Sequence, residues 1–126
     1  MTQHILIVED EPDGADLVMR MLRATGKKAV IANNAELALA HLQQAPDEFQ
    51  AVIVDLALPE MDGFELMQVI RQTPALSHLP LLAITAFHTP ELKVRALENG
   101  FDAYCSKPLD TTTFVRSLEQ LIGSTQ

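Results

Sequence analysis

Short, unbroken apolar runs alternate along this chain with stretches in which apolar residues recur at helical spacing. An apolar run of about four to eight residues is typical of a strand buried on both faces, whereas the helical spacing indicates an amphipathic helix. The runs that predict strands are Ile5–Val8, Lys28–Ala32, Ala51–Val54, Leu81–Ile84 and Ala103–Cys105. Each is followed by a helical pattern, so the predicted order is strand then helix, repeated to the end of the chain.

Capping residues, prolines and glycines predict where the helices begin and end. The predicted helical stretches run from Pro12 to Gly26, from the cap Asn33 to Pro46, from Phe64 to Pro74, from the cap Thr89 to Gly100, and from the cap Asp110 to Ile122. In the fourth of these, Val94, Leu97 and Phe101 lie on one side, which we expect to be the buried side.

Apolar strands that alternate with amphipathic helices predict a parallel sheet with helices on both faces, and right-handed crossovers make that sheet doubly wound. With 126 residues, 48% of them hydrophobic, the chain has the length and composition of one domain. We therefore expect a single α/β domain over residues 1–126, with a five-stranded parallel sheet and a core of about 4–122.

Charge and apolar content exclude some classes of function. A net charge of -8 disfavours direct binding to nucleic acid and to anionic membranes, both of which require a basic face. No apolar run approaches the roughly 20 residues of a membrane span, and the N-terminus lacks the basic segment of a targeting signal, so we expect a cytoplasmic location. The single cysteine, Cys105, is expected to be a small packed residue. The four histidines, which are expected at the surface, have no metal-ligand spacing.

Polar residues follow several of the predicted strands at the point where each one ends. Glu9 and Asp10 follow the first strand, Asp55 the third, Thr85 the fourth and Lys107 the fifth. Because the carboxyl ends of parallel strands meet at one edge of a sheet, these side chains should converge. Two unit charges about 4 Å apart repel by about 4 kcal/mol at an effective dielectric near 20, so three carboxylates require more than one cation.

Mg²⁺ suits this group of residues, with Mn²⁺ as an alternative, because hard oxygen ligands with open positions favour such ions. With the metal bound, Asp55 stays ionised and can attack a phosphoryl group to form an acyl phosphate. Thr85 and Lys107 are then placed to contact the remaining phosphoryl oxygens.

Five motifs, in this order and spacing, resemble the receiver domain of two-component response regulators, the CheY-like family with a flavodoxin-like fold. They are Glu9-Asp10, Asp55, the run from Leu58 to Gly63, Thr85-Ala86, and Tyr104 to Pro108. The resemblance implies that Asp55 accepts phosphate from a phosphohistidine. It also implies that Asp10, Asp55 and the backbone carbonyl of Ala57 bind Mg²⁺ directly and that Glu9 binds it through water.

The resemblance has further implications for switching and partners. Thr85 and Tyr104 would form a conformational switch, and Lys107-Pro108 would carry a cis peptide bond. Phosphorylation would alter the surface made by the fourth helix, fifth strand and fifth helix, which would bind a downstream protein or a second copy of the chain. The phosphodonor would be a sensor histidine kinase or a histidine phosphotransfer domain. The chain, alone or as part of a larger regulator or hybrid kinase, would not be an enzyme in its own right.

Two other functions share parts of this pattern. An aspartate-nucleophile phosphatase would place a second acid two residues after the nucleophile, where this chain has Ala57. A flavodoxin-like FMN module would cradle phosphate with hydroxyls and amides in its first loop, where this chain presents Glu9, Asp10 and Glu11. The receiver interpretation accounts for all of the motifs.

Two positions depart from the best-known members of the family. Residues two places after the phosphorylated Asp and two after the Thr flank the path of the hydrolytic water and are often polar, whereas here they are Ala57 and Phe87. Neither side chain can orient a water molecule, and Phe87 is large enough to cover a phosphoryl group. We therefore expect slow intrinsic dephosphorylation.

Overall fold

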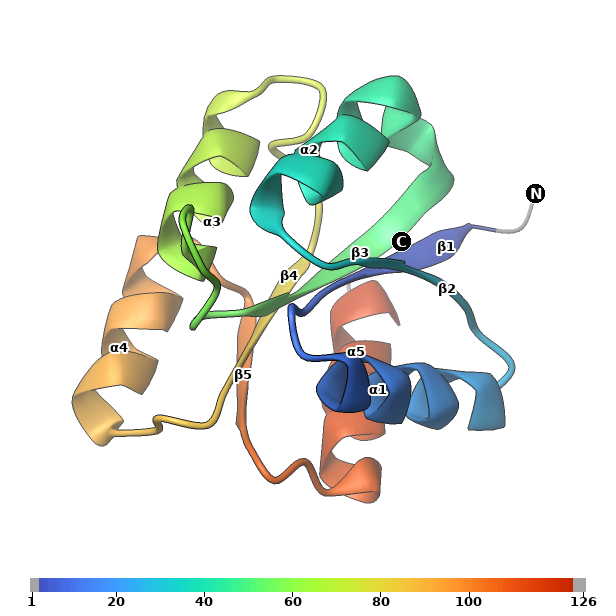
Figure 1. Ribbon diagram of the computed structural model, residues 1–126, viewed down its shortest axis with the longest axis vertical. Coiled ribbons are helices and arrows are strands. Elements are labelled where there is room, and N and C mark those ends of the chain that lie inside the picture. Colours follow the sequence, from blue (N-terminus) through green and yellow to red (C-terminus); the bar gives the residue numbers. More distant parts are fainter. Residues whose placement is uncertain (1–2, 124–126) are drawn as a thin grey trace.

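The structure, a computed structural model, describes residues 3–123 and contains one parallel sheet covered by helices on both faces (Figure 1). The strands are β1 (His4–Val8), β2 (Lys28–Ala32), β3 (Phe49–Asp55), β4 (Leu81–Thr85) and β5 (Ala103–Ser106). The helices are α1 (Pro12–Ala24), α2 (Ala35–Gln44), α3 (Gly63–Gln72), α4 (Pro90–Asn99) and α5 (Thr111–Gly123), with a short 3₁₀ turn η1 (Pro46–Glu48) before β3. Residues 1–2 and 124–126 of the expected domain lie outside the described residues.

The strand order β2-β1-β3-β4-β5 confirms the predicted doubly wound α/β fold. The central strand, β3, pairs with β1 on one side and with β4 on the other. Helices α1 and α5 cover one face of the sheet, and α2, α3 and α4 cover the other, so each face has its own hydrophobic cluster. The central strands β1, β3 and β4 are therefore buried on both sides, as their apolar runs predicted, whereas the edge strands β2 and β5 are partly exposed.

Several boundaries differ from the sequence-based expectation by one or two residues. The cap of α2 is Asn34, whose side chain accepts a hydrogen bond from the Leu37 amide, and not the neighbouring Asn33. Helix α3 begins at Gly63, one residue before the expected Phe64, and Asp62 caps it in a capping box with Glu65. The cap Thr89 and first residue Pro90 of α4 are confirmed.

The buried side of α4 was predicted wrongly. Val94 is 53% exposed and Leu97 41% exposed, and Ala96 is the one fully buried residue of the helix. Apolar residues occur on more than one side of α4, so their spacing alone did not identify the side that faces the sheet. Phe101, which follows the helix, is buried as expected.

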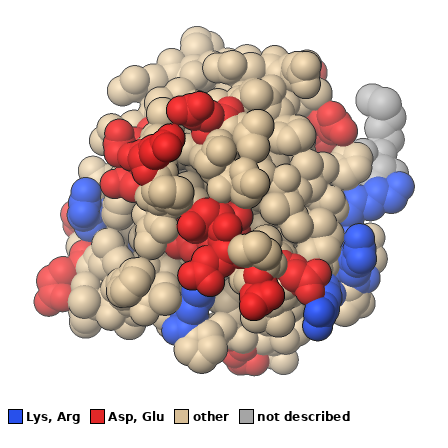
Figure 2. Space-filling view, viewed as in Figure 1, with Lys and Arg blue, Asp and Glu red and all other residues tan. Residues whose placement is uncertain are grey.

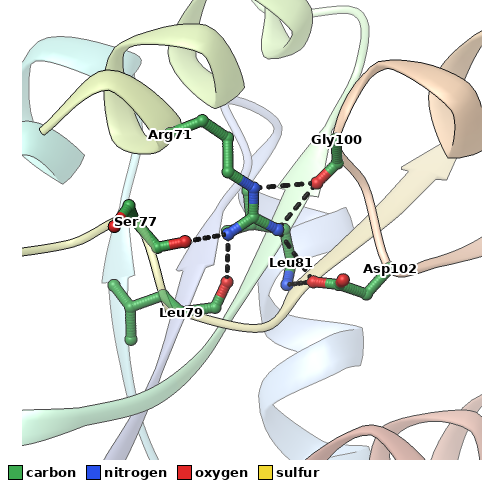
Figure 3. Close-up of polar contacts among 6 residues, drawn as sticks. All are labelled: Arg71, Ser77, Leu79, Leu81, Gly100 and Asp102. Carbon is green, nitrogen blue, oxygen red and sulfur yellow. Dashed lines mark hydrogen bonds and ion pairs between the residues drawn. The ribbon is translucent and has the colours of Figure 1, made fainter. Parts of the chain in front are cut away.

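One arginine ties together three segments at the edge of the sheet opposite the carboxyl ends of the strands (Figure 3). Arg71, near the end of α3, donates hydrogen bonds to the carbonyls of Ser77, Leu79 and Gly100 at 2.7–3.0 Å. It also pairs with Asp102 at 2.8 Å, and the same Asp102 oxygen accepts from the amide at the start of β4. This network holds the C-terminal ends of helices α3 and α4 against the start of strand β4.

Within the part of the chain that the structure describes, none of the helices combines the length and the apolar character that crossing a membrane requires.

Candidate functional site

The carboxyl ends of β1 and β3 bring three acidic side chains together. Val8 and Val54 are register partners, so Glu9 and Asp55 follow neighbouring positions on adjacent strands. Carboxylate oxygens of Glu9, Asp10 and Asp55 all lie within 4.8 Å of one another. Figure 2 shows acidic side chains gathered near the centre of the face viewed, over the region where Figure 1 shows β1 passing into α1. Glu9 and Asp55 are buried, whereas Asp10 is exposed.

Lys107, which follows β5, supplies a positive charge to this cluster. Its ammonium lies 2.5 Å from Oε1 of Glu9 and 2.9 Å from Oδ2 of Asp55. Its backbone amide donates to the carbonyl of Thr85 at 2.8 Å, which fixes Lys107 against the end of β4. The Lys107-Pro108 peptide bond is cis.

Burial, hydrogen bonds and neighbouring charges shift the pKa values of Glu9 and Asp55 in opposite directions. Burial, together with a hydrogen bond to Asp55 and repulsion by its charge, raises the pKa of Glu9 to about 7. Burial would also raise the pKa of Asp55, but hydrogen bonds from Glu9, Lys107 and the Ala57 amide outweigh it and lower that pKa. Burial would lower the pKa of Lys107, yet its bonds to both carboxylates raise it. Asp55 is thus the carboxylate that is held ionised.

The donor set fits a divalent cation. Oε2 of Glu9 is buried and has no hydrogen-bond partner among the described residues, and a buried carboxylate oxygen without a partner is costly. Three carboxylates face one ammonium, so two positive charges are lacking when all three acids are ionised. All of the candidate ligands are oxygens, which Mg²⁺ prefers.

Thr85, the last residue of β4, lies beside the end of β3. Its side chain is buried, and its hydroxyl accepts a hydrogen bond from the Phe87 amide at 3.1 Å. The side chain of Phe87 is 70% exposed, and Ala57 is exposed as well. The Ala57 amide donates to Oδ1 of Asp55 at 2.9 Å, so each oxygen of Asp55 has a donor.

Tyr104, in the middle of β5, is half-buried. Its hydroxyl lies 2.9 Å from Nδ1 of His88, in the loop between β4 and α4, and the two rings are 5.5 Å apart. His88 and His78 are exposed, as expected, whereas His4 and His41 are half-buried. The contact of His88 with Tyr104 was not predicted.

Two glycines allow the backbone to approach the site: Gly14, which the sequence did not single out, and Gly63, which ends the motif that begins at Leu58. A Cβ on Gly14, in the first turn of α1, would lie 2.5 Å from Oε1 of Glu9. A Cβ on Gly63 would lie 2.7 Å from the carbonyl oxygen of Asp55. A glycine inside a helical pattern is the sequence signal for such a close approach, because glycine otherwise weakens a helix.

Comparison with known proteins shows similarity over most of the length of this chain. The model of the response regulator receiver domain matches residues 5–119. An uncharacterized 14.6 kDa protein of Leptolyngbya boryana is 39% identical over 116 residues, which are 92% of this chain and 87% of that protein. The hybrid signal transduction histidine kinase M of Dictyostelium discoideum is 32% identical over 121 residues, 94% of this chain but 5% of the kinase.

A solved structure adds information on the metal. The receiver domain of the sensor histidine kinase PA1611 of Pseudomonas aeruginosa, determined with magnesium coordinated in its active site cleft, has a TM-score of 0.86 and 27% identity to this chain. The similarity covers 98% of this chain and 99% of that structure.

Proposed function

Because the chain belongs to the response regulator receiver domain family, we propose that Asp55 is its phosphoacceptor and that the phosphodonor is a phosphohistidine. The observation that carries this proposal is the environment of Asp55. It ends the central strand, it is held ionised, and both of its oxygens are fixed by donors. A carboxylate that is desolvated, ionised and oriented is a competent nucleophile.

In the transfer, the bond from an Asp55 oxygen to phosphorus forms as the phosphorus-nitrogen bond to the imidazole breaks. The imidazole nitrogen keeps the electron pair. Lys107 remains within reach to neutralise charge on the phosphoryl oxygens. The Thr85 hydroxyl, which accepts from the Phe87 amide, can turn to donate its own hydrogen to one of these oxygens. The product is an acyl phosphate.

Receiver domains of this family bind Mg²⁺ in an acidic pocket, and the pocket of this chain has the matching donors. We propose that Asp10, Asp55 and the Ala57 carbonyl bind the ion directly and that Glu9 binds it through water, with Mn²⁺ as an alternative ion. A bound divalent cation would screen the carboxylates and the incoming phosphoryl charge.

The proposed output is a change of the surface made by α4, β5 and α5, driven by Thr85 and Tyr104. A downstream protein or a second copy of the chain would bind there, and a sensor histidine kinase or a phosphotransfer domain would supply the phosphate. The chain belongs to a signalling family, and we propose that it assists only its own phosphorylation and dephosphorylation, in the cytoplasm.

The test is phosphorylation by acetyl phosphate, read by mass spectrometry. The wild type should gain one phosphoryl group that is stable in acid and labile in base, and EDTA should prevent the gain until Mg²⁺ is restored. Asp55→Asn should abolish the gain while the far-ultraviolet circular dichroism spectrum is retained.

Asp47→Asn is the matched control, because Asp47 is exposed and lies outside the site, and it should be phosphorylated normally. Full phosphorylation of the Asp55→Asn variant would disprove the assignment. Adding Mn²⁺ in place of Mg²⁺ after EDTA tests the second ion.

A further inference from the structure

The hydroxyl of Tyr104 has a specific partner in this chain. The distance of 2.9 Å to Nδ1 of His88 is that of a hydrogen bond in which either group can be the donor, depending on the histidine tautomer. The two rings are tilted by 53° with centroids 5.5 Å apart. Tyr104 is therefore held in this position by a polar and an aromatic contact from the same side chain.

His88 belongs to the loop after β4, whose backbone is hydrogen-bonded to the side chain of Thr85. The Thr85 hydroxyl accepts the amide hydrogen of Phe87, and His88 is the next residue. If the Thr85 hydroxyl turns to a phosphoryl oxygen, the Phe87 amide loses its acceptor, and the backbone that carries His88 is released at that point. Thr85 is thus connected to Tyr104 through two hydrogen bonds, one from the Phe87 backbone amide to the Thr85 hydroxyl and one between the side chains of His88 and Tyr104.

The place of His88 also matters for the surface. His88 and Tyr104 help to line a groove of about 300 Å³. Its other lining residues come from α4, from β5 and the loop after it, and from the start of α5, with Lys93 and Asp110 among them. A movement of Tyr104 away from His88 would change the shape of this groove. The groove lies on the surface proposed above as the output.

We infer that His88 is a positioning residue of the switch, which holds Tyr104 at the surface while Asp55 carries no phosphate. The inference rests on the proposed function. An interaction made only in the unphosphorylated conformation opposes the binding of any ligand that favours the other conformation. Loss of the His88 contact should therefore tighten the binding of a phosphoryl analogue.

The chain allows a direct experiment, because it contains one tyrosine and no tryptophan. In protein labelled with 3-fluorotyrosine, a single fluorine resonance reports the environment of Tyr104. The resonance is recorded with Mg²⁺ and increasing beryllofluoride, which gives its free and bound positions and the apparent affinity.

Three variants are compared with the wild type. In His88→Ala, the resonance of the free protein should move toward the beryllofluoride-bound position, and the affinity should rise roughly three- to tenfold, the equilibrium factor of one neutral hydrogen bond. His88→Asn keeps a hydrogen-bonding group close to the position of Nδ1 and should restore part of both effects. His78→Ala, at another exposed histidine, should match the wild type.

The outcomes separate the two proposals. If the wild type and the Asp55→Asn variant respond alike to beryllofluoride, the phosphoacceptor assignment fails, and the role of His88 fails with it. If the wild type binds through Asp55 but His88→Ala leaves resonance and affinity unchanged, or weakens the binding, the phosphoacceptor stands and the positioning role of His88 is overturned. Equal effects of His88→Ala and His88→Asn would also overturn it, because the hydrogen bond would then be irrelevant.

Discussion

Ala57 and Phe87 are the two residues whose side chains we expect to govern the lifetime of the acyl phosphate. Neither can orient a water molecule for attack on phosphorus. We predict that an Ala57→Asn, Phe87→Glu double variant loses its phosphate roughly tenfold faster than the wild type, because a polar side chain at each position can hold the water in line. The measurement is the decay of protein phosphorylated by acetyl phosphate, after removal of the donor.

The exposure of Phe87 sharpens this prediction. Its side chain is 70% exposed in the unphosphorylated chain, so it shields phosphorus only if it turns inward when phosphate is bound. The single variants separate the two contributions: Ala57→Asn alone measures the positioning of water, and Phe87→Ala alone measures shielding. A double variant that decays at the wild-type rate would show that these side chains do not protect the acyl phosphate.

Residues that act through one polar contact were the hardest to predict. Asp55, Glu9 and Lys107 were predicted because they end apolar strands, where a charge is conspicuous. His88 gives no such signal, since an exposed loop histidine is ordinary and its partner Tyr104 is 16 residues away. Gly14 was likewise assigned only to its helix.

At the scale of elements, the network of Arg71 joins α3, the start of β4 and the loop before β5. We predict that Arg71→Ala lowers the free energy of unfolding by about 3 kcal/mol, because it leaves half-buried carbonyls and Asp102 without their donor. Arg71→Lys should recover less than half of this loss, since one ammonium cannot replace a planar group that donates in several directions. Urea unfolding followed by circular dichroism measures both.

Arg20→Ala is the control for Arg71. Arg20 is 75% exposed, and Asp16, one turn earlier on α1, is its only ion-pair partner among residues 3–123. Its loss should therefore change the free energy of unfolding by less than about 0.5 kcal/mol. Equal losses for Arg71→Ala and Arg20→Ala would mean that the network adds nothing beyond an ordinary surface ion pair.

Strands were predicted more reliably than helix orientation, for a physical reason. An apolar run buried on both faces has one interpretation, and four of the five strands begin within one residue of the expected position. The exception, β3, begins at Phe49 and so includes two residues before the apolar run. A short helix such as α4, with apolar residues on more than one side, depends on packing that the local spacing does not encode. Asn33 and Asn34 are equivalent cap candidates in sequence, and the backbone decides between them.

At the scale of the whole molecule, metal binding should stabilise the fold. A ligand that binds only the folded chain adds about 2.7 kcal/mol to its stability at 100 times the dissociation constant. We predict that Mg²⁺ raises the midpoint of thermal unfolding by several degrees at constant ionic strength. Differential scanning calorimetry with Mg²⁺ or with NaCl of equal ionic strength tests this.

Asp10→Asn provides the matched variant for the metal. Asp10 is exposed, so the change should leave the fold intact while it removes one proposed ligand. Its midpoint without Mg²⁺ should be close to that of the wild type, and its response to Mg²⁺ should be smaller. An identical rise for NaCl and Mg²⁺ in the wild type would show ionic screening in place of specific binding.

The pair formed by Glu9 and Lys107 spans 98 positions of the chain. During synthesis the proposed nucleophile, Asp55, is made before α3, whereas its ammonium partner arrives only when β5 has been made. Contacts of such long sequence separation form late, because loop closure must precede them. A nascent or truncated chain would therefore carry Asp55 without the ammonium that lies 2.9 Å from its Oδ2 in the folded site. Competence to receive a signal would thus be withheld until β5 has been synthesised and this domain has folded around Lys107.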